Sequence, residues 1–262
     1  MDVRLPDSEE GSALEKDHIP QAKQGAWGQI GRVFFAPSSA FDFLAEHHNW
    51  LPPFLISGAI GMIASLLSIS AVFKVQAAVM QRIMADRPEA QQPASTLNAV
   101  QSLQHVVTYG TAVVGPWLLP LFVSLVAAFI LGLVSLTGKD GIPFRRLYGI
   151  AMWATLPAGV TSAILQSVWL VTVPTESALA DGGHLNATLT LLTPALSHSS
   201  WTFRILWSAN LFTIWTAVLI AIGYFALSRR SALRATLAAL AYWVLASGYG
   251  LYGLAQVDKV VK

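Results

Sequence analysis

The side chains that most often perform catalysis or bind metals are few in this chain and lie far apart in it. The sequence holds no cysteine, which excludes thiol chemistry and cysteine metal sites. It holds six histidines. His47 and His48 are adjacent, so a helix would point them to different faces, and His18 and His184 have no carboxylate at ligand spacing. We therefore predict a protein that is not an enzyme, with no catalytic residue, cofactor or metal site.

Two uncharged polar residues inside long apolar runs are the main candidates for a specific contact. Gln166 falls in one run, and Asn210 falls in another, six residues after Arg204. At 1.5 Å per residue, a helix would place Asn210 about 9 Å below that arginine. The pattern favours an interhelical hydrogen bond that fixes packing, and a ligand or ion contact is the alternative.

Five apolar runs must position these residues, and each is long enough to cross a membrane. A transmembrane helix needs about 20 apolar residues, and none of the runs contains Asp, Glu, Lys, Arg or His. Only 11% of the chain is charged, against about 25% in soluble domains. The sequence therefore predicts an all-α fold, a polytopic bundle of five transmembrane helices with interfacial amphipathic helices. The runs are Leu51–Phe73, Ala112–Gly138, Leu147–Val173, Ile205–Ser228 and Ala235–Gln256.

The segments outside the runs differ in character. Residues 1–24 mix acids and bases with few apolar residues, which predicts a disordered tail. Residues 25–50 are predicted to be an interfacial amphipathic segment, in which Pro37 begins a helix and Trp50 lies at the level of the lipid headgroups. Residues 51–256 form the five-span domain, and residues 257–262 form a C-terminal tail.

A second interfacial helix is predicted between the first two runs. There Leu97, Val100, Leu103 and Val107 recur at helical spacing among polar residues. We expect this helix to lie along the outer membrane surface, apart from the second span.

The distribution of lysine and arginine predicts the orientation in the membrane. With the N-terminus in the cytoplasm, the inside segments hold ten of these residues and the outside segments hold six. We therefore predict a cytoplasmic N-terminus and an external C-terminus. The net charge of +2, without a basic face, indicates that nucleic acid is not a partner.

Small residues four apart in every run predict how the spans hold together. Lipid tails are as apolar as leucine, so helices in a membrane associate through close backbone approach and polar contacts. Four of the stripes include a glycine, and we predict these four glycines to be helix-packing residues. They are Gly61, Gly132, Gly159 and Gly250.

Several local motifs, taken in order, resemble bacterial proteins of the Ypt-interacting protein (Yip) family. They are Phe34-Phe35-Ala-Pro37-Ser-Ser-Ala40-Phe41 with Asn49-Trp50-Leu51-Pro52-Pro53; Gly138-Lys-Asp-Gly141 with Phe144-Arg145-Arg146-Leu147-Tyr148 and Leu156-Pro157; and Asn210-Leu-Phe212-Thr-Ile-Trp215 with Leu219-Ile-Ala-Ile-Gly223. The resemblance covers residues 34 to about 250. It implies a five-span domain with a cytoplasmic N-terminus in the bacterial cytoplasmic (inner) membrane. In eukaryotes the family is tied to vesicle trafficking, membrane shaping and small-GTPase contact.

Three functions are compatible with these features. The leading hypothesis is a non-enzymatic membrane organiser or scaffold that has the lipid bilayer, a second copy of itself or another membrane protein as partner. A permease or channel for a neutral or lipidic solute is the alternative, supported by Gln166, Asn210 and the prolines of the second and third runs. An enzyme acting at the headgroups would need the cluster Asp42, Glu46 and His47–His48, for which a solvated helix face is the favoured interpretation.

Overall fold

The computed structural model describes residues 25–47, 49–85, 94–137, 141–180, 209–228 and 231–260, with single positions between 185 and 206. Within these residues the chain is helical, apart from short connections and one isolated bridge that pairs Thr188 with Asn210. The predicted tail at residues 1–24 lies outside the described residues. The elements are η1 (Ala26–Gly28), α1 (Gln29–Phe35), α2 (Pro37–Glu46), α3 (Leu51–Ala85), α4 (Ala94–Leu136), α5 (Phe144–Thr172), α6 (Thr175–Ala180), α8 (Leu211–Leu227) and α9 (Ala232–Val260).

Three of the five predicted runs coincide with helices that are long and apolar enough to cross a membrane. These stretches are Leu51–Arg82 of α3, Ala99–Leu136 of α4 and Phe144–Thr172 of α5. The fourth and fifth runs coincide with shorter apolar helices, Leu211–Leu227 and Ala232–Gly248. The all-α prediction is therefore confirmed for the described part of the chain, with three helices of membrane-spanning length and composition.

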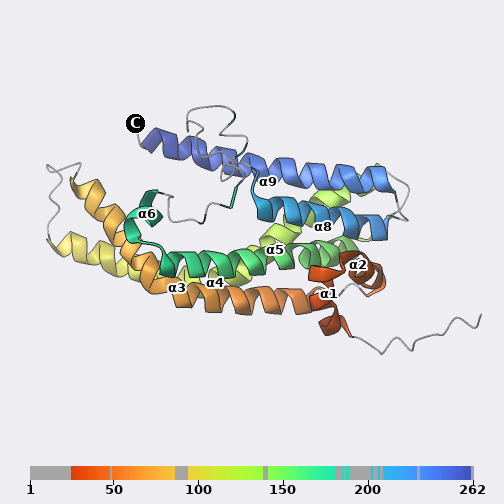
Figure 1. Cartoon of the computed structure of the whole chain (residues 1–262), viewed down its shortest axis with the longest axis horizontal. Coiled ribbons are helices and arrows are strands. Elements are labelled where there is room, and N and C mark those ends of the chain that lie inside the picture. Colours follow the sequence, from red (N-terminus) through yellow and green to blue (C-terminus); the bar gives the residue numbers. More distant parts are fainter. Residues whose placement is uncertain are drawn as a thin grey trace, which may run out of the picture.

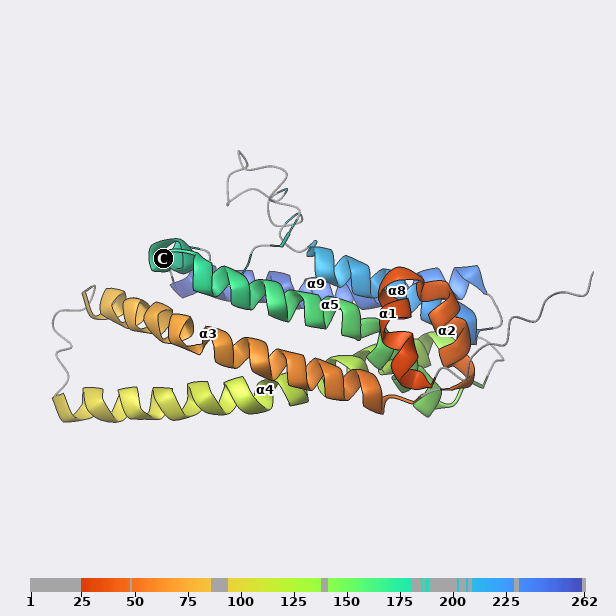
Figure 2. The same ribbon diagram turned by 60° about the horizontal axis from the view of Figure 1, so that its bottom comes forward.

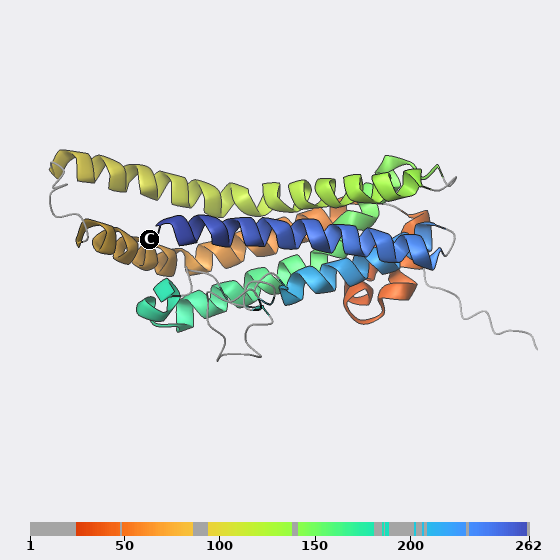
Figure 3. The same cartoon turned by 90° about the horizontal axis from the view of Figure 1, so that it is seen from above.

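The helices form an elongated bundle in which α5 is central (Figure 1). This helix packs against α3, α4 and α8, and α9 packs against α8 and α4. Seen from above, α9 lies between α4 and α8 (Figure 3). Helices α1 and α2 lie at one end of the bundle, and the C-terminal end of α9 lies at the other (Figure 1). Successive long helices alternate in direction along the bundle (Figure 1).

The predicted interfacial segment is two short helices packed on the bundle. Pro37 occupies the first turn of α2, where its missing N–H is tolerated. Phe41 and Leu44 of α2 are fully buried, in contact with a core formed by α5 and α8. The apolar face of α2 is thus covered by protein in place of lipid. The reason that α2 packs on protein is the space beside Gly223 of α8, which has no side chain and leaves room for the Phe41 ring.

The second interfacial helix was predicted wrongly, because residues 94–107 are the first part of α4. The 43 residues of α4 extend about 64 Å, and the 35 of α3 about 52 Å, both well beyond a ~30 Å hydrocarbon core. The free end of the α3–α4 pair projects past α5 and α6 (Figure 2). One helix continues through the amphipathic part and the apolar part, across Gly110, which lies between them. It also continues through Pro116 and Pro120.

Candidate functional site

Gln166 of α5 binds the chain segment that leads toward α8. Its Oε1 atom accepts a hydrogen bond of 2.6 Å from the backbone N–H of Leu185. Two residues later, the carbonyl oxygen of Ala187 accepts a 2.9 Å hydrogen bond from the N–H of Leu211, the first residue of α8. Gln166 therefore holds a non-helical segment against the bundle.

Asn210 is the N-cap of α8, whereas the sequence placed it inside a helix. Its Oδ1 atom accepts a 2.8 Å hydrogen bond from the N–H of Phe212, and its backbone is extended. The first N–H groups of a helix have no intrahelical acceptor, and asparagine is among the best residues to supply one. The uncharged run Ile205–Ser228 carries no signal for where within it the helix begins, which explains the misplacement.

Together these two residues satisfy backbone groups where irregular chain meets the start of α8. In an apolar environment each unsatisfied N–H costs free energy, so non-helical backbone persists only where it finds partners. Gln166 and Asn210 serve neighbouring parts of one structure, since Leu185 and Ala187 connect them. Of the two, Gln166 also lines the pocket described next, and Asn210 does not.

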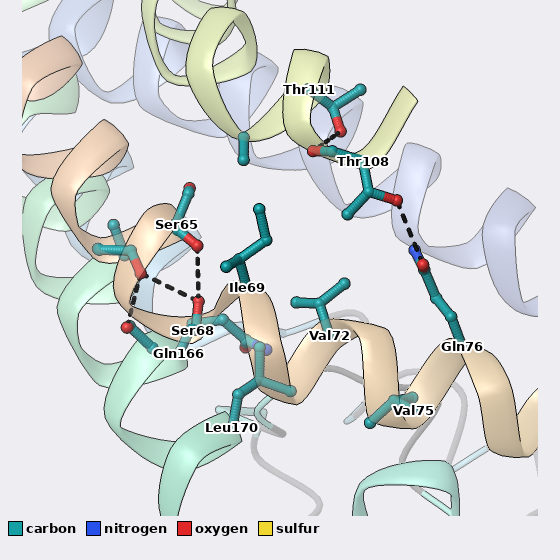
Figure 4. Close-up of a pocket in the computed structure, with 14 residues that line it drawn as sticks. Ser65, Ser68, Ile69, Val72, Val75, Gln76, Thr108, Thr111, Gln166 and Leu170 are labelled. Carbon is teal, nitrogen blue, oxygen red and sulfur yellow. Dashed lines mark hydrogen bonds between the residues drawn. The ribbon is translucent and has the colours of Figure 1, made fainter. Parts of the chain in front are cut away.

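A pocket of about 470 Å³ lies between α3, α4 and α5 (Figure 4). Its volume falls within the ~300–1,000 Å³ typical of small-molecule sites. Half of the fourteen lining residues carry an uncharged polar side chain, and none carries a charge. The polar ones are Ser65, Ser68 and Gln76 of α3, Thr108 and Thr111 of α4, and Gln166 and Ser167 of α5.

Gln76 lies at one end of the pocket and bonds two side chains of α4. Its Oε1 atom accepts two hydrogen bonds, one of 3.1 Å from Gln104 Nε2 and one of 3.2 Å from Thr108 Oγ1. Figure 4 shows Gln76 and Thr108 facing each other from α3 and α4. The two helices are therefore joined by side-chain hydrogen bonds where they border the pocket.

The other end of the pocket is closed by two buried serines. Ser167 of α5 donates a 2.8 Å hydrogen bond to the carbonyl oxygen of Ala64, and Ser68 donates to the same oxygen at 3.0 Å. These hydroxyl protons are already used within the protein. The bond from Ser167 also links α5 to α3.

The four glycines predicted to pack helices lie in different environments. A Cβ atom on Gly61 would lie 2.9 Å from Cβ of Pro116, so α3 and α4 approach closely there. A Cβ on Gly132 would make only an ordinary contact with Leu147, and one on Gly159 would meet nothing within 4 Å. Gly250 lies on α9, outside the residues whose surroundings the structure describes.

Sequence reasoning missed the residues that form the polar end of the pocket. The first span was predicted to end at Phe73, which left Gln76 outside it, and Gln104 was assigned to a surface helix that ended before Thr108. A signal was present: Gln104 and Thr108 are four residues apart, so on a continuous helix they share one face.

No group of three or more histidine, aspartate or glutamate side chains suited to a metal ion occurs among the described residues. His105 instead packs its ring 4.4 Å from that of Phe73, measured between centroids.

Comparison of the chain with protein-family models, with curated proteins and with solved structures found no match.

Proposed function

We propose that this protein is a five-span, non-enzymatic organiser of the bacterial inner membrane, of the Yip type, that acts by associating with a second copy of itself or with another membrane protein. Its N-terminus lies in the cytoplasm and its C-terminus outside. The proposal rests on the resemblance of its local motifs to that family and on the features set out below.

The alternating directions of α3, α4, α5, α8 and α9 support five crossings. Helix α8 is the shortest of these five helices, and its 17 residues extend only about 25 Å, less than the ~30 Å hydrocarbon core. The bridge between Thr188 and Asn210 adds length before its start, where Gln166 accepts a hydrogen bond from the N–H of Leu185, and Asn210 accepts one from the N–H of Phe212 in the first turn of α8. A short helix can complete a crossing when the non-helical backbone before it has its hydrogen-bond partners within the protein.

The observation that carries the organiser proposal is the apolar surface on the projecting α3–α4 pair. Lys74 of α3 is exposed, which argues against a position within hydrocarbon. Gln76 accepts hydrogen bonds from Gln104 and Thr108, which fixes how the antiparallel helices α3 and α4 lie side by side. The part of α4 before Gln104 therefore lies on the same side of Lys74 as the projecting end of the pair. Leu103 there is 65% exposed. Exposed apolar side chains outside the lipid favour contact with another protein.

Reporter fusions test the topology. We expect alkaline phosphatase, which is active only outside the cytoplasm, to be active when fused at Lys262 and inactive when fused after Ser228. Phosphatase activity in the Ser228 fusion with none in the Lys262 fusion would show the opposite orientation. Equal activity in both fusions would show that α9 does not cross the membrane.

Cysteine crosslinking tests association, because the natural chain contains no cysteine. In native membranes, Leu103→Cys treated with a short bifunctional maleimide should give a product of twice the 28.2 kDa chain mass or one defined heavier product. Leu237→Cys, on an exposed position of α9, is the matched control. A Leu103→Cys protein that stays entirely monomeric would refute the organiser proposal.

A permease for a neutral or lipidic solute is the second candidate, and the uncharged pocket between α3, α4 and α5 favours it. Such a protein would accelerate the passage of a neutral solute or lipid across the membrane of reconstituted vesicles. A flux equal to that of empty vesicles would remove this candidate while leaving the crosslinking result unaffected.

A further inference from the structure

The pocket between α3, α4 and α5 has unused hydrogen-bonding capacity at one end. Both lone pairs of Gln76 Oε1 are occupied, by Gln104 and Thr108. A glutamine amide also has two N–H donors, and among the described residues Nε2 of Gln76 has no acceptor. The protein thus presents a fixed amide donor at this end of the pocket.

An acceptor lies one helical turn away on α4. Pro116 has no N–H, so it cannot donate to the carbonyl oxygen of Ala112, four residues before it. Ala112 lines the pocket. Thr108, the partner of Gln76, precedes Ala112 by one turn, or about 6 Å along α4. The carbonyl oxygen of Ala112 therefore lacks its usual helical donor about one turn from the residue that bonds Gln76.

The rest of the pocket is suited to an apolar body. Ile69 and Val72 of α3 and Leu170 of α5 line it between the two polar ends (Figure 4). Ser65 and Gln76 are eleven residues apart on α3, which is about 16 Å. The lining holds no lysine, arginine or histidine to pair with a phosphate, and no acid to pair with an amine.

We propose that this pocket binds an uncharged lipid with a hydroxylated head, of the mono- or diacylglycerol class. The head accepts a hydrogen bond from Gln76 Nε2 and donates one to the carbonyl oxygen of Ala112. The first part of an acyl chain lies along Ile69, Val72 and Leu170. Neither self-association nor transport is required for this binding, so the proposal stands apart from the organiser function.

Photolabelling of the full chain tests this proposal. The purified protein is reconstituted into phosphatidylcholine vesicles that contain a diacylglycerol with a diazirine in its acyl chain. The comparison probe is phosphatidic acid with the same diazirine chain, which differs by its phosphate. We expect diacylglycerol to label peptides of α3, α4 and α5 around the pocket roughly tenfold more than phosphatidic acid, since a buried phosphate would have no cation.

Two substitutions with matched controls locate the site. Gln76→Leu removes the amide donors, and its control is Gln101→Leu on an exposed position of α4. Ala112→Leu fills the pocket without touching the hydrogen bonds between Gln76, Gln104 and Thr108, and its control is the exposed Val113→Leu. Loss of one hydrogen bond should reduce diacylglycerol labelling between about twofold and tenfold.

Equal labelling by both lipids would show ordinary bilayer contact and overturn the proposal, as would labelling that maps away from the pocket. Labelling that survives Ala112→Leu unchanged would also overturn it, even if Gln76→Leu failed to fold. Crosslinking through Leu103→Cys is measured separately, so failure of lipid binding and failure of association are distinguishable.

Discussion

At the scale of single residues, hydrogen bonds join parts of the chain that lie far apart in sequence. The indole Nε1 of Trp153 on α5 donates a 2.8 Å hydrogen bond to the carbonyl oxygen of Asn49, just before α3. Trp153 is fully buried. This bond holds the start of the first long helix against the central one.

We expect Trp153→Phe to lower the free energy of unfolding by about 1 kcal/mol or more. The substitution removes a buried donor and leaves the carbonyl of Asn49 without it. Thermal unfolding of the detergent-solubilised protein measures the effect. Trp169→Phe on the same helix is the control, because its indole makes no hydrogen bond among the described residues. Equal loss for both variants would contradict the role assigned to this bond.

Asn210→Ala should destabilise the protein by about 0.5–2 kcal/mol, the usual cost of losing an N-cap side chain. The N–H of Phe212 would then lack its acceptor. Asn210→Ser retains a capping oxygen and should recover most of the stability. Thermal unfolding in detergent again measures the difference, and a serine variant as weak as the alanine variant would argue that Asn210 acts otherwise.

The glycines of α3 and α5 should respond differently to a methyl group. Gly61→Ala places Cβ against Pro116, and we expect a loss of about 1–3 kcal/mol from overpacking. Gly159→Ala meets open space, so it should be neutral or stabilise the helix by up to about 1 kcal/mol. Unfolding of both variants in detergent checks the contrast, and similar effects would be evidence against close approach of α3 and α4.

At the scale of elements, the placement of α2 is the main departure from a surface helix. Phe41 is fully buried against the bundle, whereas Phe35 of α1 is 91% exposed. Phe41→Ala should cost about 3–5 kcal/mol, as truncation of a buried phenylalanine does, and Phe35→Ala should cost far less. Limited proteolysis should then release the N-terminal helices from the Phe41→Ala protein first. If only membrane affinity changed, α2 would be a lipid-facing helix.

The long helices show which element-level features sequence can predict. Uncharged runs located the helices because a charge in hydrocarbon is costly. The ends were less predictable: α3 continues past Phe73 and α4 begins before Ala112, since polar residues such as Gln76 and Gln104 do not end a helix. The start of α8 depends on a cap that the apolar pattern does not reveal.

At the scale of the whole molecule, α5 joins the two halves of the bundle. It contacts α3 and α4 on one side and α8 on another, and α2 packs at its N-terminal end. The buried core lies where α2, α4, α5, α8 and α9 meet, whereas the pocket lies farther along α3, α4 and α5. Among the described residues, burial is therefore greatest toward the end that carries α1 and α2.

The sequence by itself determined that the chain is helical and has helices long and apolar enough to cross a membrane, because soluble domains rarely carry uncharged runs of this length. It also identified Gln166 and Asn210 as unusual. Only the tertiary structure decided that Gln166 holds the segment before α8, that Asn210 caps this helix, and that Gln76 faces Thr108. The physical reason is that lipid tails and apolar side chains are nearly equivalent partners, so composition does not select which face of a helix meets another helix.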